Sequence, residues 1–220
     1  MCFNSTISFT AGAVIGAVGL LTLKNSKGVS QLFFAGIPII FSLQQITEGF
    51  LWIALKHAEY AKWQQLFTVI FILFAQVVWP VWVPLSIMLL EKNRNRKIVL
   101  RILFFIGTAS SLFGAYRLIF YPVVAMIEKH HIKYVFEFSA KILAFTPLLY
   151  ILPTIISLFV STVKKMVLLG ILILFSFLAA EYFFREYSLS VWCFFAAGVS
   201  CVIFIIIRNL NPKINQSTLR

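Results

Sequence analysis

Long apolar runs separated by short charged segments are the main feature of this sequence. Each run extends over about 17 to 25 residues, the length that an α-helix needs to cross the hydrocarbon core of a bilayer. Backbone groups in hydrocarbon must be hydrogen-bonded within their own segment, and the alternating pattern of a barrel strand is absent, so each run predicts a helix. The expected spans are residues 5–23, 31–55, 66–90, 98–120, 141–162, 166–184 and 190–207.

This pattern predicts an all-α fold, an integral membrane bundle of seven transmembrane helices. Residues 1–207 form its single domain, and residues 208–220 form a polar tail. Lys and Arg residues indicate the orientation, because cytoplasmic loops carry an excess of them. Twelve of the 19 basic residues lie on the side that holds the C-terminus, five of them in or just after "EKNRNRK". The N-terminus is therefore expected outside and the tail in the cytoplasm.

The composition agrees with a membrane protein. Hydrophobic residues make up 61% of the 220 residues and charged residues 12%, and the mean hydropathy is +0.96. Soluble domains carry about 25% charged residues. The net charge of +12 is divided among short clusters, which suits loops facing anionic lipid better than a continuous surface for phosphate. The lipid bilayer is thus the expected partner, and nucleic acid is not.

Two packing features are expected inside the bundle. Gly12, Gly16 and Gly19 lie along one face of the first span, where small residues let two helices approach closely. Proline removes a backbone donor and kinks a helix, and two spans contain a pair of prolines. These prolines are Pro80, Pro84, Pro147 and Pro153.

The strongest candidate site is "FSLQQITEGF" in the second span, which places Gln44, Gln45 and Glu48 among apolar residues. On a helix the three side chains fall within about 100°, and Gln44 and Glu48 are one turn apart. A carboxyl group at the bilayer centre costs roughly 2.5–3.5 kcal/mol on insertion scales, so this stripe is expected to face the bundle. Two interpretations stay open: a proton, cation or ligand site, and a buried polar contact that holds helices together.

Two further groups lie near span ends on the expected outer side. Tyr116 and Arg117 have the pattern of an aromatic belt with an anchoring charge. Arg117 shares the outer leaflet with Glu48, however, and is its expected partner if the two helices approach. Glu181 and Arg185 are one helical turn apart and are expected to form an ion pair at the outer surface.

Residues 121–140, "YPVVAMIEKHHIKYVFEFSA", form the longest connection. Their mixture of aliphatic, charged and aromatic residues predicts a short helix lying at the outer interface. His130 and His131 would point about 100° apart on such a helix, and no third His or Cys occurs at ligand spacing. A solvated pair is the preferred interpretation, and neither a metal nor another cofactor is expected.

Several activities lack the residues that they require. The last span contains no lysine for a retinal Schiff base. No histidine lies within a span to serve as a base or a zinc ligand, and no phosphate-binding glycine loop or Gly-x-Ser-x-Gly motif occurs. No catalytic residue is assigned from the sequence.

Several blocks of the chain match one family pattern in order. They are "MCFNSTISF", "QQITEGFLW", "WPVWVPLSIMLLE", "YR" at 116–117, "LLYILPTIISLFVS" and "LSVWCFFAAGVS" followed by Arg208. The chain resembles an uncharacterised family of bacterial multi-pass membrane proteins, a domain of unknown function whose members begin Met-Cys-Phe-Ser. Here Asn4 stands where that family usually has Ser. The resemblance implies an architecture and a location in the bacterial cytoplasmic membrane, and it supplies no substrate.

The residues marked by this resemblance gather in one leaflet of the expected topology. Converging polar and sulfur groups are what a ligand pocket needs, so an outward-facing cavity is expected around Glu48. A disulfide between Cys2 and Cys193 is an alternative in an oxidising periplasm. The expected ligand-binding residues are Asn4, Gln44, Gln45, Glu48, Tyr116, Arg117 and Cys193.

Three functions from different classes remain open. The first is binding or transport of a small or lipid-like ligand, with Glu48 as the ionisable group. The second is a structural or assembly subunit in which the polar stripe joins helices. The third is an intramembrane enzyme acting on a lipid or quinone, which needs a second catalytic group within about 2.6–3.2 Å of Glu48 or one water away. The first is preferred, because intramembrane carboxyl groups usually mark functional sites.

Overall fold

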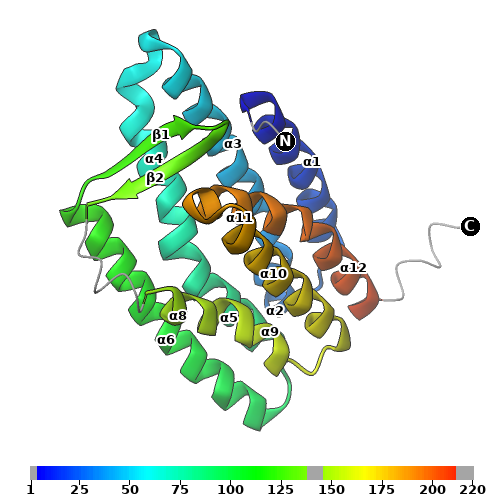
Figure 1. Ribbon diagram of the computed structural model, residues 1–220. Coiled ribbons are helices and arrows are strands. Elements are labelled where there is room, and N and C mark those ends of the chain that lie inside the picture. Colours follow the sequence, from blue (N-terminus) through cyan, green and yellow to red (C-terminus); the bar gives the residue numbers. More distant parts are fainter. Residues whose placement is uncertain (1–3, 138–145, 212–220) are drawn as a thin grey trace, which may run out of the picture.

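The computed structural model describes residues 4–137 and 146–211, and these are mostly helical (Figure 1). The first part contains α1 (Ser5–Lys24), α2 (Val29–Ala35), α3 (Ile37–Lys56), η1 (Ala58–Trp63), α4 (Gln64–Ile72), η2 (Leu73–Val78), α5 (Trp79–Leu90) and α6 (Arg94–Phe120). Two strands follow, β1 (Val123–Glu128) and β2 (His131–Phe136). The last part contains α8 (Thr146–Ile151), η3 (Leu152–Ile156), α9 (Ser157–Val160), α10 (Lys164–Phe183), η4 (Arg185–Tyr187), α11 (Ser188–Gly198) and α12 (Ser200–Leu210).

The apolar runs of the sequence correspond to helices of membrane-spanning length. Six helical stretches of the described chain are long and apolar enough to cross a bilayer, which confirms the expectation of a helical multi-pass membrane protein. They are Ser5–Lys24, Val29–Lys56, Ala58–Leu90, Arg94–Phe120, Lys165–Phe183 and Arg185–Leu210. The remaining expected span, 141–162, differs: its residues 141–145 lie outside the described part, and a shorter apolar helix, Pro147–Val160, occupies the rest.

Small residues bring α1 into close contact with α3, as the sequence predicts. A Cβ at Gly12 would lie 2.8 Å from the side chain of Ile46, and one at Gly19 would lie 2.5 Å from that of Ile39. The Ser42 hydroxyl donates a hydrogen bond to the Gly12 carbonyl oxygen over 2.7 Å. The packing role predicted for the glycines of the first span is therefore confirmed.

Two π-helical segments, η2 and η3, interrupt the helices that contain the proline pairs. The segment η2 leads directly into α5, which has Pro80 in its first turn and Pro84 inside, and η3 itself contains Pro153. Such segments are a recognised cause of helix irregularity, and a proline without an N–H favours them by removing a helical hydrogen bond. The irregularity expected at these prolines thus takes the form of π-helical turns.

The helix α6 packs backbone to backbone against this irregular region. A Cβ at Gly107 would collide with the Pro80 carbonyl oxygen, and one at Gly114 would lie 2.8 Å from the Gln76 carbonyl oxygen. Between them, the Ser111 hydroxyl donates to a carbonyl oxygen of η2 over 2.7 Å. Small side chains at these positions of α6 are therefore required by the close approach of the two helices.

Residues 121–140 contain a β-hairpin, so the interfacial helix predicted for this connection is wrong. The strands β1 and β2 pair antiparallel, with Glu128 opposite His131 at the closed end. The two-residue loop of Lys129 and His130 has φ values of 46° and 66°, the positive sign at both positions that a type I′ turn requires. The loop lacks the Asn-Gly or Asp-Gly pair that marks such turns, which explains why the sequence did not reveal it.

The hairpin lies across one end of the bundle, called the hairpin end below (Figure 1). Lys133 of β2 forms ion pairs with Glu128 over 3.1 Å and with Glu186 of η4 over 2.7 Å. The Tyr187 hydroxyl donates to Glu128 over 3.1 Å. Hydrogen bonds from Lys133 and Tyr187 hold the pKa of Glu128 below its ordinary value. These contacts attach the hairpin to the connection between α10 and α11.

At the opposite end of the bundle, buried Glu91 joins the α5–α6 loop to the loop before α10. Its carboxylate accepts hydrogen bonds from the backbone N–H of Asn93 and from the N–H and hydroxyl of Thr162, over 2.7–2.9 Å. Burial by itself raises the pKa of Glu91, but these hydrogen bonds outweigh it and hold the pKa below its ordinary value. Arg96 adds a hydrogen bond to the Ser161 carbonyl oxygen over 2.9 Å.

Candidate functional site

Glu48 lies in the interior of the bundle, between α3 and α11. It is 3% exposed, and its Oε1 accepts a hydrogen bond from the Ser190 hydroxyl. Gln44 and Gln45, on the same helix, are fully buried. The polar stripe of the second expected span therefore faces other helices and not the lipid side of the bundle.

Gln44 connects three helices through its side-chain amide. Its Nε2 lies within hydrogen-bonding distance of the Cys193 sulfur of α11, at 3.2 Å. Its Oε1 accepts a hydrogen bond from the Trp79 indole N–H of α5 over 2.8 Å. An amide that is satisfied on both sides holds helices in one arrangement, so this residue has a clear structural role.

Polar groups near Glu48 form what we call the buried polar centre, comprising Gln45, Glu48, Trp52 and Tyr134. Gln45, Glu48 and Trp52 are spaced three, four and seven residues apart on α3 and so share one face. Among the residues that the structure describes, both amide atoms of Gln45, the Trp52 indole nitrogen and the Tyr134 hydroxyl have no hydrogen-bond partner. Burial raises the pKa of Tyr134 well above its ordinary value, and the nearby charge of Glu48 adds to this effect.

Arg117 near the end of α6 is buried, with 5% of its surface exposed. Its guanidinium carbon lies 4.9 Å from the ring centre of Phe136 and 5.9 Å from that of Phe113. Within the described chain no ion pair joins Arg117 to Glu48, so the pairing expected from their shared leaflet does not form. Placement in one leaflet leaves the rotation of each helix undetermined, and Glu48 meets Ser190 of α11 while Arg117 lies over Phe136 of β2.

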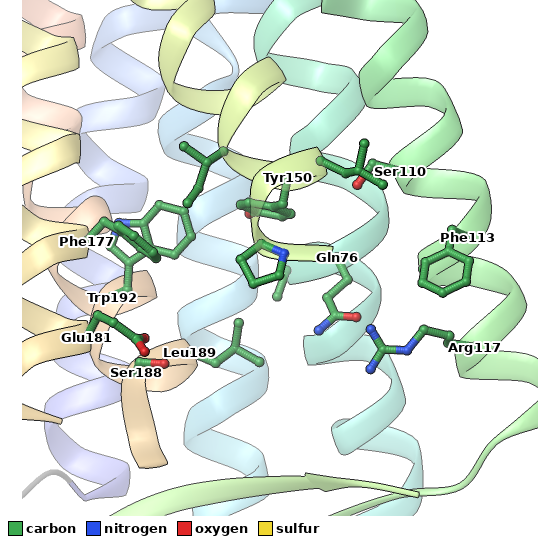
Figure 2. A pocket seen from close by; sticks show the side chains of 15 residues that line it. Gln76, Ser110, Phe113, Arg117, Tyr150, Phe177, Glu181, Ser188, Leu189 and Trp192 are labelled. Atoms are coloured by element: carbon green, nitrogen blue, oxygen red, sulfur yellow. The ribbon is translucent and has the colours of Figure 1, made fainter. Parts of the chain in front are cut away.

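Arg117 lies on the wall of a cavity of about 420 Å³, bounded by η2, α6, α8, α10 and α11. Figure 2 shows the arrangement of its lining side chains. Figure 2 places Arg117 on one side and Glu181 and Ser188 on the other, with Gln76 of η2 between them. The volume falls in the range of about 300–1,000 Å³ that is usual for small-molecule sites. The cavity therefore combines apolar walls with a few convergent polar groups.

Aromatic side chains form one side of this cavity. The Trp192 ring meets Tyr150 edge to face with centres 5.6 Å apart, and it meets Phe177 edge to face at 5.1 Å. All three residues line the cavity, together with Glu181. The Oε1 of Glu181 is 3.5 Å from the Nε of Arg185, so the predicted ion pair is confirmed, although Arg185 lies in η4, just past the end of α10.

A second, smaller cavity of about 60 Å³ shares Tyr150 and Trp192 with the first. Its other lining residues are mostly apolar and include Phe41 and Trp79, whose rings stack with centres 4.0 Å apart. Cys193 also contributes to this wall. Tyr150 and Trp192 thus separate the larger, partly polar cavity from the smaller, apolar one.

The residues expected to share one pocket are divided among different places. Arg117 lines the larger cavity and Cys193 the smaller one, while Gln44, Gln45 and Glu48 belong to the packed interior beside them. Asn4 caps α1, where its Oδ1 accepts a hydrogen bond from the Ile7 N–H over 2.9 Å. Tyr116 is 46% exposed and contacts Phe120 and Tyr121. Cys2 lies outside the described residues, while Cys193, its partner in the alternative disulfide, is a buried free thiol.

Some cavity residues were not assigned to a site from the sequence. In the sequence Glu181 indicates only half of a surface ion pair, and nothing in the local pattern marks Gln76 or Ser110 as site residues. Trp192 was marked by the family resemblance, which was the one available indication. His131, considered for metal binding, is buried at the hairpin end and stacks on Tyr187 with ring centres 4.9 Å apart. In the described part of the chain no group of three or more His, Cys, Asp or Glu side chains is arranged around a common point that could hold a metal.

These features define a class, a helical multi-pass membrane protein with a charged cavity between its helices. Residues 1–217 match a family of unknown function, DUF6629, and the chain belongs to that family. No curated protein and no solved structure matches the sequence. The expectation of an uncharacterised family is therefore confirmed.

Proposed function

We propose that this protein binds a small or lipid-like ligand in the cavity that contains Arg117. The observation that carries the proposal is a buried guanidinium on the wall of a space of about 420 Å³ among apolar helices. Ionisable groups at membrane depth are costly to insert, and they are usually retained where they meet a substrate or an ion. A cavity beside such a group supplies the volume that a ligand needs.

We further propose that the cavity opens toward the outside of a bacterial cytoplasmic membrane. The distribution of Lys and Arg supports an outside N-terminus and a cytoplasmic C-terminus. Arg117 lies close to the hairpin end, because α6 ends three residues after it. The hairpin end is then the outer end, and the buried Glu91 network lies at the cytoplasmic end.

The same topology supports seven crossings of the bilayer. The hairpin follows α6 at one end, whereas α10 begins at the other end, where Thr162 bonds to Glu91. Under this proposal the chain between β2 and α10 passes from the outer to the inner end. The helix Pro147–Val160 is the part of this passage that the structure describes, and at 1.5 Å per residue its length is about 21 Å.

Filling the cavity tests the proposal. Ser110 of α6 lines the cavity, and Ser110→Trp places an indole in that space. Leu112→Trp is the matched control, because Leu112 lies on the same helix and is 68% exposed. The protein would be extracted in mild detergent, and its bound small molecules and lipids would be measured by native mass spectrometry.

We expect a specific bound species to be lost in Ser110→Trp and kept in Leu112→Trp. Leu149→Trp provides a second filling variant, since Leu149 lines the cavity and is 41% exposed, so no fully buried residue is replaced. Identical bound species in the wild type and all three variants would contradict the proposal.

A structural role is the second candidate, and it applies to the stripe around Glu48. The contacts of Gln44 with Trp79 and Cys193, and of Ser190 with Glu48, join α3, α5 and α11. Under this proposal Glu48→Gln keeps an acceptor for Ser190 and leaves ligand binding in the larger cavity unchanged. The intramembrane enzyme has less support, because the side chain that donates to the Glu48 carboxyl group is the hydroxyl of Ser190, and no acid or base partner is seen beside Glu48 in the described chain.

A further inference from the structure

The larger cavity carries opposite charges on facing walls. Arg117 on α6 and Glu181 on α10 both line it, and Figure 2 shows them on opposite sides with Gln76 and Leu189 between them. We propose that the ligand is a zwitterion whose anionic group faces Arg117 and whose ammonium group faces Glu181 and Trp192. This inference rests on the proposed function and adds the chemical class of the ligand.

The Arg117 side of the cavity suits a carboxylate or a phosphate. The guanidinium has its carbon over the rings of Phe136 and Phe113, 4.9 and 5.9 Å from their centres. Its N–H donors lie in its plane and match the two oxygens of such an anion. Figure 2 shows the Gln76 side chain with its amide oxygen toward the guanidinium and its NH2 group on the far side, where that group can act as a further donor. A lysine at this position would keep the charge but lose the paired geometry.

The Glu181 side suits an ammonium group, quaternary or primary. Trp192 and its edge-to-face neighbours Tyr150 and Phe177 provide aromatic surface, and a cation within about 6 Å of a Trp ring is attracted to its face. The carboxylate of Glu181 adds a full negative charge. Its ion pair with Arg185 is loose, at 3.5 Å with 85% of the Arg185 side chain exposed, and solvent weakens such pairs.

Charge balance is the reason to prefer one ligand with both charges. A simple anion at Arg117 would also experience the repulsion of Glu181, and a simple cation at Glu181 would experience that of Arg117. These interactions are stronger among apolar helices than in water, because the effective dielectric constant is lower there. A zwitterion satisfies both walls at once.

This chemistry has two natural sources, a zwitterionic lipid headgroup and a free solute such as a betaine or an amino acid. The protein would be reconstituted in nanodiscs of phosphatidylglycerol, which has an anionic headgroup and no ammonium. Binding of glycerophosphocholine, glycine betaine, glycerol phosphate and choline would then be measured by the shift of the thermal unfolding midpoint. A parallel set of nanodiscs containing phosphatidylcholine tests competition by lipid.

We expect glycerophosphocholine or glycine betaine to bind the wild type and raise its unfolding midpoint. Glycerol phosphate and choline should bind at least about tenfold more weakly. Glu181→Gln should lower the affinity for the zwitterion by about tenfold. It should raise the affinity for glycerol phosphate relative to that for the zwitterion, because the repulsion between Glu181 and the anion is removed. Arg185→Gln is the matched control and should bind as the wild type does. Competition by phosphatidylcholine would assign the site to lipid headgroups, and unchanged binding would assign it to free solutes.

The two proposals fail in different ways. If glycerol phosphate binds the wild type as well as glycerophosphocholine does, and Glu181→Gln changes neither, the zwitterion inference is overturned while a ligand site remains. Glu181 is partly exposed, so this variant is expected to fold even if Arg117→Gln does not. If no bound species responds to Ser110→Trp and none of the four probes binds, the proposed function itself is overturned.

Discussion

The Ser190 hydroxyl donates a hydrogen bond to the Glu48 carboxyl group and so ties α11 to α3 inside the bundle. The two residues are 142 positions apart in the chain, and both are buried. A buried carboxyl group needs a donor, and Ser190 is the donor that the fold provides. This contact therefore explains how an acidic residue is accommodated without the expected arginine.

Ser190→Ala should destabilise the protein by about 1–3 kcal/mol, because it leaves a buried carboxyl oxygen without its donor. Ser176→Ala is the control, since the Ser176 hydroxyl is also buried but bonds only to the Ile173 carbonyl oxygen of its own helix. Thermal unfolding in detergent, followed by circular dichroism, measures the difference. Equal midpoints for the two variants would show that the Ser190 contact contributes nothing.

Acidification should weaken the network around Glu91, at the end of the bundle opposite the hairpin. The pKa of Glu91 is lower in the folded protein than its ordinary value of 4.5, so the folded state favours the ionised form. Stability from this group is therefore fully present above the ordinary pKa and is lost as the pH falls through the lowered one. The unfolding midpoint of the wild type should fall below about pH 4.5 more steeply than that of Glu91→Gln.

Glu91→Gln should also be the less stable protein at pH 7, where the wild-type carboxylate accepts hydrogen bonds from Asn93 and Thr162. The comparison cancels the contributions of the other carboxyl groups, which titrate in both proteins. Parallel pH profiles for the two proteins would contradict the assignment of this effect to Glu91.

Gly107→Ala should be among the most damaging small substitutions in the chain. The added methyl group would meet the Pro80 backbone, which cannot move aside as a flexible side chain could. We expect a loss at the upper end of the about 1–3 kcal/mol that overpacking usually costs. Gly198→Ala receives the same methyl group where no atom lies within 4 Å, and its unfolding midpoint should stay near that of the wild type.

The hairpin turn should be improvable. Lys129 and His130 both adopt positive φ, which costs a side-chain-bearing residue roughly 1–2 kcal/mol and costs glycine almost nothing. Replacing the pair by Asn-Gly should stabilise the hairpin by about 1 kcal/mol and slow amide hydrogen exchange in β1 and β2. The control, His130→Ala, keeps the strained conformation and should give no such gain, so equal exchange rates in both variants would refute the explanation.

The apolar runs were sufficient to locate the spanning helices. Six of the expected spans coincide with membrane-length helices, because length and hydropathy together determine whether a segment can cross a bilayer. Local spacing also predicted the Glu181–Arg185 pair, whose members are four positions apart, and the glycine face of α1. Relations within one helix follow from 3.6 residues per turn and need no knowledge of the fold.

The hairpin shows where such local reasoning failed. Its strands are amphipathic and rich in β-branched residues, but the same residues also fit an interfacial helix, and its turn uses Lys-His. The pairing with the α10–α11 connection, through Lys133 and Glu186, comes from residues 53 positions apart. Tertiary contacts of this range decide between helix and strand when the local pattern allows both.

By itself the sequence determined that this is a helical membrane protein of an uncharacterised family, that Glu48 is held away from lipid, and which helix faces are small enough to pack closely. The tertiary structure alone decided that Glu48 meets Ser190 and that Arg117 instead shares a cavity with Glu181 and Trp192. The physical reason is that transfer out of water depends on composition, which each segment carries in its own residues. Which charged groups meet depends on how the helices are rotated and packed, and that is settled only when all of them are assembled.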